Sequence, residues 1–549
     1  MKKQTKKKQR ILWRSSFSKI TGLCDAGFSE DQAVELKNMR PYAGGLRLRD
    51  GIMKGLTFTE SPSFVGSANV SGRMTGFYSN ESATYSLFDF DEYMFDGSNV
   101  CKPLSKNDFL FNLSGKTFLY RMLEREFYVM SGGEFEPAEK GNPTRAVRGN
   151  RAERDDVLLS TSLFDGLARI DFELTASTTV LDLGVKPAAI SSVKCRGSAV
   201  GYSLDAKNLR LSESVPSGST VSVIFRPHYM SANPSQPFLT GACSEDDSDV
   251  WLHTKNDIYH ASFEDGKLCV SASALNVSGN IEKVFKCEDR TLAVVGTSVG
   301  EVDIKNGRIR FLKNGNVRSA KAVCPVGPCA YIYGNGRVER LSVSRSGSES
   351  ELISVALSGR LFKQVVGETV SLAYSPRDRT LWLLYKPAYI NGRIYVLDED
   401  SGIWFEVDGG WEKTPTHLMP IGDGVAVVCE DGMYFSHPDF IQDICRGTRT
   451  TIKGEIVLCA TVCSSPNEKK RLIRMGALLS GPNVDITLKA ESDTGRSDTY
   501  NTSLYPSARS LSTALCRMDV GRSSALTLSA KVDGTSYSVL HELFAEISG

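Results

Sequence analysis

Two short motifs contain residue types that could do chemistry: a serine nucleophile and a phosphate-binding loop. Residues 296–300 (GTSVG) match the G-x-S-x-G pattern, whose serine stands on a sharp turn from a strand into a helix. The residues that follow (EVDIKNGRI) read as a strand, so we interpret this motif as a hairpin turn. Residues 114–117 (SGKT) are similar to the end of a phosphate-binding loop, but Leu110 stands where its first glycine is needed. Neither motif predicts an active site.

Residues that bind metals do not cluster along the chain. The acidic run 245–249 lacks the spacing and the glycine of a calcium-binding EF-hand loop, and we interpret it as a solvated loop. The thirteen cysteines form no C-x-x-C pair, and the six histidines are scattered. Most cysteines lie in apolar runs, as Cys429 and Cys459 do, which favours small buried residues in a reducing compartment. The sequence predicts no metal and no cofactor.

Sugar chemistry would need two carboxylates about 5 to 9 Å apart, and such residues can be distant in sequence. Nothing in the sequence singles out a pair, and the Asp boxes of sialidase-type propellers are absent. Aromatic residues gather in two places, where they either pack between strands or form an exposed platform for a sugar. These residues are Tyr85, Phe88, Phe90, Tyr93 and Phe95, and then Trp404, Phe405 and Trp411. We predict no catalytic residue and no enzymatic activity.

The composition is that of an ordinary folded protein. The chain has 549 residues, of which 41% are hydrophobic and 23% charged, and it is long enough for several domains. Its 65 basic and 64 acidic residues nearly balance, whereas a protein that binds DNA over its whole surface should be far more basic. No apolar run approaches the ~20 residues that span a bilayer, and the basic N-terminus lacks the apolar middle of a signal peptide. Synthesis in a cytosol is expected.

Strands joined by tight turns recur from about residue 46 to residue 447. Asp-Gly and Asn-Gly pairs, which accept the positive φ angles of hairpin turns, mark many of these turns. They begin at Asp96, Asp165, Asp265, Asn306, Asn335, Asn391, Asp423 and Asp431. Apolar strands before and after such turns repeat at roughly 40 to 50 residues in the middle of the chain, which is typical of a β-propeller. The sequence predicts an all-β fold built on an irregular propeller.

Five regions follow from these patterns. Residues 1–45 form a basic arm and a short helix, which begins at a capping box of Ser29 and Gln32 and is stopped by Pro41. The propeller occupies 46–176 and 230–449. A small β-sandwich or barrel is inserted at 177–229, where short strands break the repeat. Strict apolar-polar alternation in NVDITLKAE and ALTLSAKVDG predicts an antiparallel β-sandwich or platform domain over 450–549.

The N-terminal arm is the one region with an uneven charge. Its basic residues are Lys2, Lys3, Lys6, Lys7, Lys8, Arg10 and Arg14. The arm is either a solubilising tail or a segment that docks on an acidic protein surface or on nucleic acid.

The segment 17–52 resembles the opening of a family of virion proteins from tailed bacteriophages. These begin with a helix, an Asn-Met pair, a glycine turn and an Arg-x-Gly stretch, and continue as a propeller. The matching residues are Leu36, Asn38, Met39, Gly44, Gly45, Leu46, Arg49 and Gly51. The end of the chain (KKRLIRMGALLSGPNVDITLKAESDTG, then alternating strands) and the insertion are also similar to this family. The chain therefore resembles the tail nozzle, tail tubular protein B or head-to-tail stopper of short-tailed phages.

The resemblance implies a structural protein of the phage tail that is made in the host cytoplasm and incorporated into the virion. Such proteins form a homo-oligomeric ring, expected to be a hexamer, below the portal and adaptor. They contact tail fibre or tail needle proteins and, transiently, the genomic DNA that their channel conducts and retains. As assembly contacts we predict the basic arm and Leu36, Asn38, Met39, Arg47 and Arg49. A glycan-binding propeller, a glycan-cleaving enzyme and a cellular scaffold remain as alternatives.

Overall fold

The structure is a computed structural model. It describes residues 10–16, 33–57, 65–70, 74–79, 85–89, 98–100, 108–131, 134–231, 234–243, 249–288, 290–303, 308–344, 347–354, 357, 361, 369–388, 391–421, 423–445, 448–458, 461–462, 469–505 and 510–548. The chain forms two compact units, Met1–Pro62 with Asn316–Gly549 (unit 1) and Ser63–Gly315 (unit 2). Strands dominate both, so the all-β, propeller-type fold class is confirmed. No helix in the described ranges is long and apolar enough to cross a membrane.

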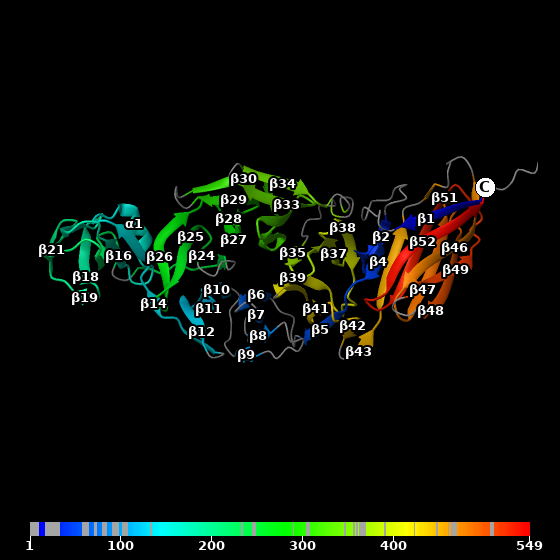
Figure 1. Ribbon diagram of the computed structural model, residues 1–549, viewed down its shortest axis with the longest axis horizontal. Helices are drawn as coiled ribbons and strands as arrows, with labels where there is room; N and C mark the ends of the chain where they lie inside the picture. Colours follow the sequence, from blue (N-terminus) through cyan, green and yellow to red (C-terminus); the bar gives the residue numbers. More distant parts are fainter. Residues whose placement is uncertain are drawn as a thin grey trace, which may run out of the picture. The chain divides into compact units, whose positions relative to one another are not determined.

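Unit 2 contains four-stranded antiparallel sheets, the blades of a propeller, together with the inserted domain (Figure 1). Their strands, in chain order, are β6 (Val65–Val70), β7 (Met74–Ser79), β8 (Tyr85–Asp89) and β9 (Ser98–Val100); β10 (Phe109–Leu113), β11 (Lys116–Arg121), β12 (Glu126–Ser131) and β13 (Glu134–Pro137); β23 (Gly241–Cys243), β24 (Asp249–His253), β25 (Asp257–Glu264) and β26 (Lys267–Asn276), with β14 (Lys140–Gly141) beside β26; and β27 (Ile281–Cys287), β28 (Arg290–Val295), β29 (Ser298–Asp303) and β30 (Arg308–Asn316).

The serine motif at residues 296–300 and the phosphate-loop-like residues 114–117 both lie in hairpin turns. Ser114 and Gly115 have φ of 52° and 70° in the turn between β10 and β11, which is a hairpin connection. Gly296 has φ of 59° in the turn between β28 and β29, and Ser298 begins the second of these strands. The hairpin interpretation of residues 296–300 is confirmed, and residues 114–117 also form a hairpin.

The inserted domain is a sandwich of two sheets. One sheet contains β15 (Thr144–Arg148), β16 (Ala168–Glu173), β22 (Thr220–Pro227), β18 (Pro187–Cys195) and β19 (Ser198–Ala199), and the other contains β17 (Thr178–Asp182), β21 (Asn208–Val215) and β20 (Tyr202–Asp205). Phe172, Leu181, Leu209 and Val223 are fully buried in its core, together with Val157 of helix α1 (Arg154–Ser160). The domain begins near residue 144 rather than at 177, because β16 pairs with β22 along its whole length.

Unit 1 continues with three further blades. Their strands are β31 (Val323–Val326), β32 (Cys329–Gly334), β33 (Arg337–Ser344) and β34 (Gly347–Leu352); β35 (Thr369–Ser375), β36 (Thr380–Lys386), β37 (Arg393–Asp398) and β38 (Ile403–Val407); and β39 (Pro415–Ile421), β40 (Gly424–Cys429), β41 (Gly432–Ser436) and β5 (Ile52–Thr57). The last blade therefore takes its fourth strand from the beginning of the chain. Beyond β5 the same sheet adds β42 (Asp443–Cys445) and β43 (Thr448–Thr450).

The C-terminal domain is a sandwich built from both ends of the chain. Sheet A contains β3 (Met39–Tyr42), β4 (Gly45–Leu48), β52 (Val539–Ser548), β46 (Lys470–Ser480) and β49 (Ser512–Arg517), with β1 (Arg10–Ser16) on β52 and β50 (Arg522–Ser523) on β46. Sheet B contains β2 (Ala33–Lys37), β44 (Ile452–Leu458), β51 (Ala525–Gly534), β47 (Val484–Ser492) and β48 (Ser497–Leu504), with β45 (Thr461–Val462) on β51. The predicted alternation is confirmed, since Val484, Ile486, Leu526 and Leu528 are all buried.

The predicted N-terminal helix is wrong where the structure describes it. Residues 33–37 form β2, which pairs with β44, and residues 39–42 form β3, which pairs with β4. Asn38 between them has φ of 53°, outside the right-handed helical region. A short isolated helix is marginal in water, whereas these strands bury Leu36 and Met39 against the sandwich. The region 1–45 therefore does not stand apart from the C-terminal domain.

Candidate assembly site: an arginine–aspartate cluster on the N-terminal strands

Arg49 is the centre of a buried polar cluster within unit 1. Its side chain is 4% exposed, and its guanidinium donates to both oxygens of Asp443, at 2.7 and 2.8 Å. It also donates to the carbonyl oxygens of Asp50 (2.8 Å) and Asp408 (2.7 Å) and, through Nε, to Oδ1 of Asn38 (2.9 Å). This is a bidentate, charge-assisted pair with its remaining donors satisfied, the geometry for which arginine is better suited than lysine.

Asn38 connects three segments around Arg49. Its Oδ1 also accepts the amide of Asp408 (2.8 Å), and its Nδ2 donates to the carbonyl of Lys453 on β44 (2.9 Å). Its own amide donates to the carbonyl of Glu406 on β38 (2.7 Å). Asparagine is among the residues that tolerate a positive φ, so one side chain both permits the bend and satisfies the backbone there.

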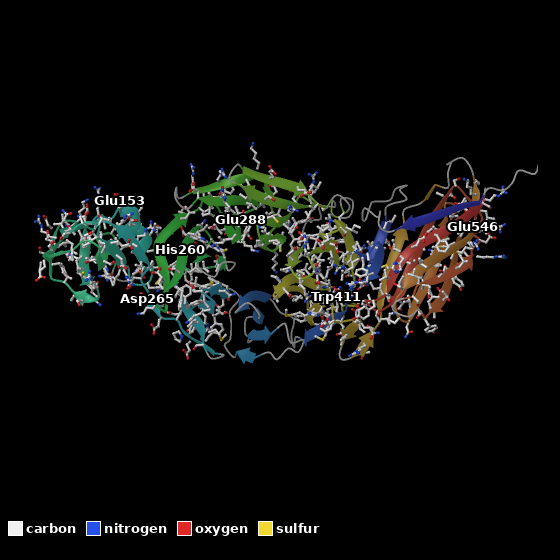
Figure 2. All side chains as sticks on the ribbon, viewed as in Figure 1. Glu153, His260, Asp265, Glu288, Trp411 and Glu546 are labelled. Atoms are coloured by element: carbon white, nitrogen blue, oxygen red, sulfur yellow. The ribbon has the colours of Figure 1, made fainter. Side chains whose placement is uncertain are left out.

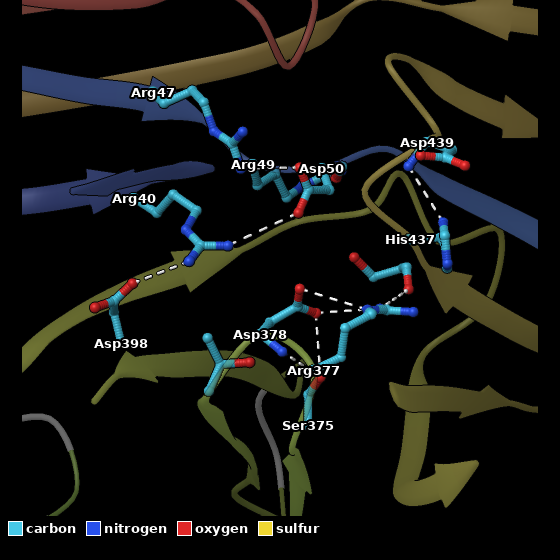
Figure 3. Close-up of polar contacts among 12 residues, drawn as sticks. Arg40, Arg47, Arg49, Asp50, Ser375, Arg377, Asp378, Asp398, His437 and Asp439 are labelled. Carbon is cyan, nitrogen blue, oxygen red and sulfur yellow. Dashed lines mark hydrogen bonds and ion pairs between the residues drawn. The ribbon is translucent and has the colours of Figure 1, made fainter. Parts of the chain in front are cut away.

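A second set of ion pairs surrounds Asp50, which is 6% exposed (Figure 3). Arg47 donates to Asp50 Oδ1 at 3.0 Å, and Arg40 lies 3.8 Å from Asp50 Oδ2 and 3.2 Å from Asp398 Oδ2. The guanidinium of Arg47 also lies 5.1 Å from the ring centre of Tyr42, which is half exposed. The β3–β4 hairpin is thereby fixed to strand β37 of a propeller blade.

The last two blades contribute the far side of the cluster. Arg377 donates to Asp378 (3.1 Å) and to the carbonyl of Ser436 (3.0 Å), and Figure 3 shows these contacts beside His437. Burial, and then the positive charge of Arg377, lower the pKa of His437 below its ordinary value. A small pocket lies between these groups, lined by Arg40, Arg49, Asp50, Asp378, Trp382 and Phe405.

The cluster is a structural joint, by which we mean the buried contacts that hold the N-terminal strands to the last two blades and the C-terminal sandwich. Arg40, Arg47, Arg49 and Arg377 each face a carboxylate, so opposite charges are matched within the chain. Burial alone would raise the pKa of Asp408, but the hydrogen bonds from Lys37 and from the Gly410 amide hold it below the ordinary value. No group of three or more His, Cys, Asp or Glu side chains in the described ranges is placed to hold a metal ion.

Four of the predicted assembly contacts lie in the interior of the chain, which corrects them. Leu36, Asn38, Met39 and Arg49 are at most 4% exposed, so they contact their own chain and offer no surface to a neighbour. Arg47 is half-buried against Asp50. Arg10 and Arg14 belong to strand β1 and not to a free arm, as their pairing with β52 requires. Lys2, Lys3, Lys6, Lys7 and Lys8 lie outside the described residues.

The contacts that Arg49 makes were not predicted from the sequence. Asp443 is 394 positions away, and nothing in its local sequence (FIQDICRG) indicates that it faces an arginine. Asp50 directly follows Arg49, so the two arginines and the aspartate of RLRD are the one local signal of this cluster.

The structure describes the side chains of one of the two predicted aromatic clusters, at Trp404, Phe405 and Trp411. Trp404 and Phe405 are buried at 1% and 3%, which confirms packing. Trp411, which Figure 2 labels, stands edge-on to Tyr434 with ring centres 5.2 Å apart. For the cluster at 85–95, the side chains lie outside what the structure describes. So do residues 244–248, which contain most of the acidic run.

No disulfide bond joins the cysteines whose side chains the structure describes. Cys243, Cys269, Cys287, Cys324 and Cys429 are buried, as their apolar surroundings predict. Burial raises the pKa of Cys269 to about 12, so that thiol stays protonated at neutral pH.

Comparisons with known proteins give weak similarities. No family model and no curated protein matches the chain. Among solved structures, virginiamycin B lyase from Staphylococcus aureus is 10% identical over 70% of this chain and 98% of its own, with a TM-score of 0.36. U3-55K is 7% identical over 72% and 100%, with a TM-score of 0.32, and a chain of the mitotic checkpoint complex is 10% identical over 69% and 93%, with a TM-score of 0.34. Similarities at this level identify neither a family nor an activity.

Proposed function

We propose that this chain is a structural protein of a phage tail, one subunit of a ring below the portal and adaptor that conducts and retains DNA. One observation carries the proposal. Three of the residues on which the resemblance rests, Asn38, Met39 and Arg49, are buried at the joint where the N-terminal strands meet the last blades and the C-terminal sandwich. Residues buried where domains meet maintain the architecture of a protein and catalyse no reaction. A resemblance that rests on such residues therefore favours a structural role.

The charge distribution supports the same proposal. Arginine and aspartate are matched pairwise within the joint, and the whole chain has a formal net charge of +1. A strongly basic surface would hold DNA phosphates through counterion release and would slow DNA passage. A nearly neutral wall is therefore suited to a conduit, and sheets closed into blades offer few free edges for unwanted association.

Under this proposal the partners are further copies of the chain in a ring, expected to be a hexamer, together with the portal or adaptor and a tail fibre or needle protein. The location is the virion, after synthesis in the host cytoplasm. The basic residues from Lys2 to Lys8 remain candidates for docking on the neighbouring ring.

Quantitative mass spectrometry of purified, DNA-filled particles tests this function. The chain should occur in a fixed ratio to the portal protein in every preparation. Absence from particles would refute the virion function, and a glycan array probed with the recombinant chain would then decide whether the glycan-binding alternative takes its place.

A deletion restricted to residues 1–9 tests the docking segment. The structure makes this shorter deletion preferable to one that reaches residue 14, because β1 begins at Arg10 and completes sheet A. Particles complemented with the shortened chain should lack it while the purified chain keeps its thermal unfolding transition. Normal incorporation would show that these lysines do not dock.

A further inference from the structure

Strand β1 occupies one edge of the last strand of the chain. It pairs antiparallel with β52 from Arg10 opposite Ser548 to Ser16 opposite Glu542, and Figure 1 shows it in blue beside the red β52. β46 takes one edge of β52 along its length, so β1 and β4 share the other. On that edge β4 reaches only Leu540 and Val539. β1 therefore covers the remainder of the edge.

This edge needs a strand. Leu543, Ala545 and Ile547 of β52 are at most 2% exposed and belong to the core of the sandwich. Glu546, which Figure 2 labels, lies between them, is also buried and forms an ion pair with Arg474 of β46. Without β1 the amides and carbonyls of 542–548 on this side would have no strand partner beside a buried core, which is the kind of open edge that recruits another chain.

The connection of β1 to the rest of the chain leaves open which copy it joins. Residues 17–32 separate β1 from β2, and sixteen extended residues reach roughly 50 Å. The pairing with β52 would be the same whether the two strands belong to one chain or to two, so exchange between identical copies changes little in contact energy. Whether β1 pairs within its own chain or with a neighbour then depends on the effective concentration of the neighbour's edge. This concentration is high wherever copies are held side by side.

We propose that β1 is exchanged between copies, so that the edge 542–548 of β52 is a docking site for the N-terminal strand of a second copy of this chain. The inference rests on the proposed function in one respect, that copies stand next to one another in a ring. Each copy then donates one strand and receives one, and the exchange closes around the ring as a head-to-tail interface does.

Engineered cysteines distinguish exchange from pairing within one chain. Ser16 and Glu542 are opposite each other in the register, and facing residues in antiparallel strands have Cα atoms about 4.5–5.5 Å apart, within the range of a disulfide. Ser16→Cys and Glu542→Cys are placed on two differently tagged copies, which are co-expressed and oxidised. A disulfide between the two tags can form only by exchange.

The expected result is a disulfide-linked pair of tagged chains at least about tenfold above the control, about 1.4 kcal/mol in preference. The control combines Ser16→Cys with Thr513→Cys, an exposed position on β49 at the far edge of sheet A. The parent chain measures the background from native cysteines. The proposal is overturned if the tagged copies stay at control level while Ser16→Cys and Glu542→Cys in one chain yield only an internal disulfide.

A second pair guards against a folding defect at Glu542. Arg10→Cys with Ser548→Cys probes the other end of the same strand, where the partly buried Ser548 tolerates a small change. Failure of exchange and failure of the virion function remain distinct. Rings with internal disulfides only would refute exchange and leave the ring intact, whereas linked copies of a chain that particles lack would support exchange and refute the virion function.

Discussion

The inserted domain and the C-terminal domain are both sandwiches of two β-sheets, yet they are assembled from the chain in different ways. Every strand of the insertion comes from one stretch, from Thr144 to Pro227, and its core is formed within that stretch. The C-terminal sandwich combines 452–548 with β1 to β4, which are some 400 positions away. The first domain is thus local in sequence, and the second depends on a pairing that the chain makes only when both ends meet.

Contacts at Gly454 show how closely the two ends fit. A Cβ at this position would collide with Leu48 and Met39, so these N-terminal side chains pack directly on the backbone of β44. Non-local pairing of this kind is slower to form and leaves open edges until it is complete. Two sandwiches of similar architecture can therefore differ in whether they fold autonomously.

The largest expected effect comes from expressing the two sandwiches alone. A fragment of residues 143–229 should fold and unfold cooperatively, because it contains every strand and the core of the insertion. A fragment of residues 448–549 should show no cooperative transition, because it lacks Leu36, Met39, Leu46 and Leu48 from its core. Circular dichroism during thermal unfolding measures both. A cooperative transition in the second fragment would show that the C-terminal sandwich also folds without the N-terminal strands.

Arg49→Met in the full chain should cost about 3 kcal/mol of unfolding free energy, because it leaves the carboxylate of Asp443, which is only 16% exposed, without its cation. The loss should appear in the transition of unit 1, followed by denaturant titration with domain-resolved hydrogen exchange. Arg210→Met is the matched control in the insertion, since Arg210 and Asp205 form an exposed pair that should contribute less than about 1 kcal/mol. Equal losses in both variants would contradict a structural role for the cluster.

Lys54→Met should destabilise the closure of the last blade by about 2 kcal/mol. Lys54 on β5 bonds to Glu412 (3.0 Å) and to Asp431, and its side chain is 3% exposed. Burial opposes its charge, but these hydrogen bonds outweigh it and raise its pKa above the ordinary value. A raised pKa stabilises the fold below the unfolded pKa of about 10.4, and that contribution is lost as the pH rises through the folded pKa.

The difference between Lys54→Met and the parent should therefore be constant near neutral pH and shrink in strongly alkaline solution. Denaturant titrations at several pH values measure it. Lys531→Met, which removes an exposed partner of Glu455, serves as the control and should change little at any pH. If the difference in unfolding free energy between the parent and Lys54→Met grew with pH, Lys54 would not be held protonated by its carboxylates.

The smallest expected effect is that of Tyr42→Ala at the tip of the β3–β4 hairpin. Its half-exposed ring lies under Arg47, and exposed cation–π contacts contribute about 0.5–1 kcal/mol. Tyr42→Phe keeps the ring and should restore the stability, which differential scanning calorimetry can resolve. A large loss in Tyr42→Ala would mean that the hairpin is a stronger part of the joint than its exposure indicates.

Features that neighbouring residues determine were predictable from the sequence, whereas features that depend on distant segments were not. Turns such as Asp265-Gly266 and Asn335-Gly336 have the positive φ angles that their residue types favour, so the hairpins were predictable. The N-terminal helix was not, because its capping signal at Ser29 and Gln32 competes with pairing to β44, more than 400 positions along the chain. The boundary of the insertion at 144 was missed for a similar reason, since β15 and β16 resemble blade strands until β22 pairs with them.

The all-β class, the hairpin turns, the alternating strands of the C-terminal sandwich and the burial of most described cysteines can be predicted from the residues alone. Each of these follows from the side-chain period of a strand or from the φ preference of single residues, which are local properties. That β5 completes the last blade, that β1 covers β52 and that Arg49 faces Asp443 became known from the folded chain. Partner choice between distant segments depends on which buried groups can satisfy one another, and no local pattern contains that information.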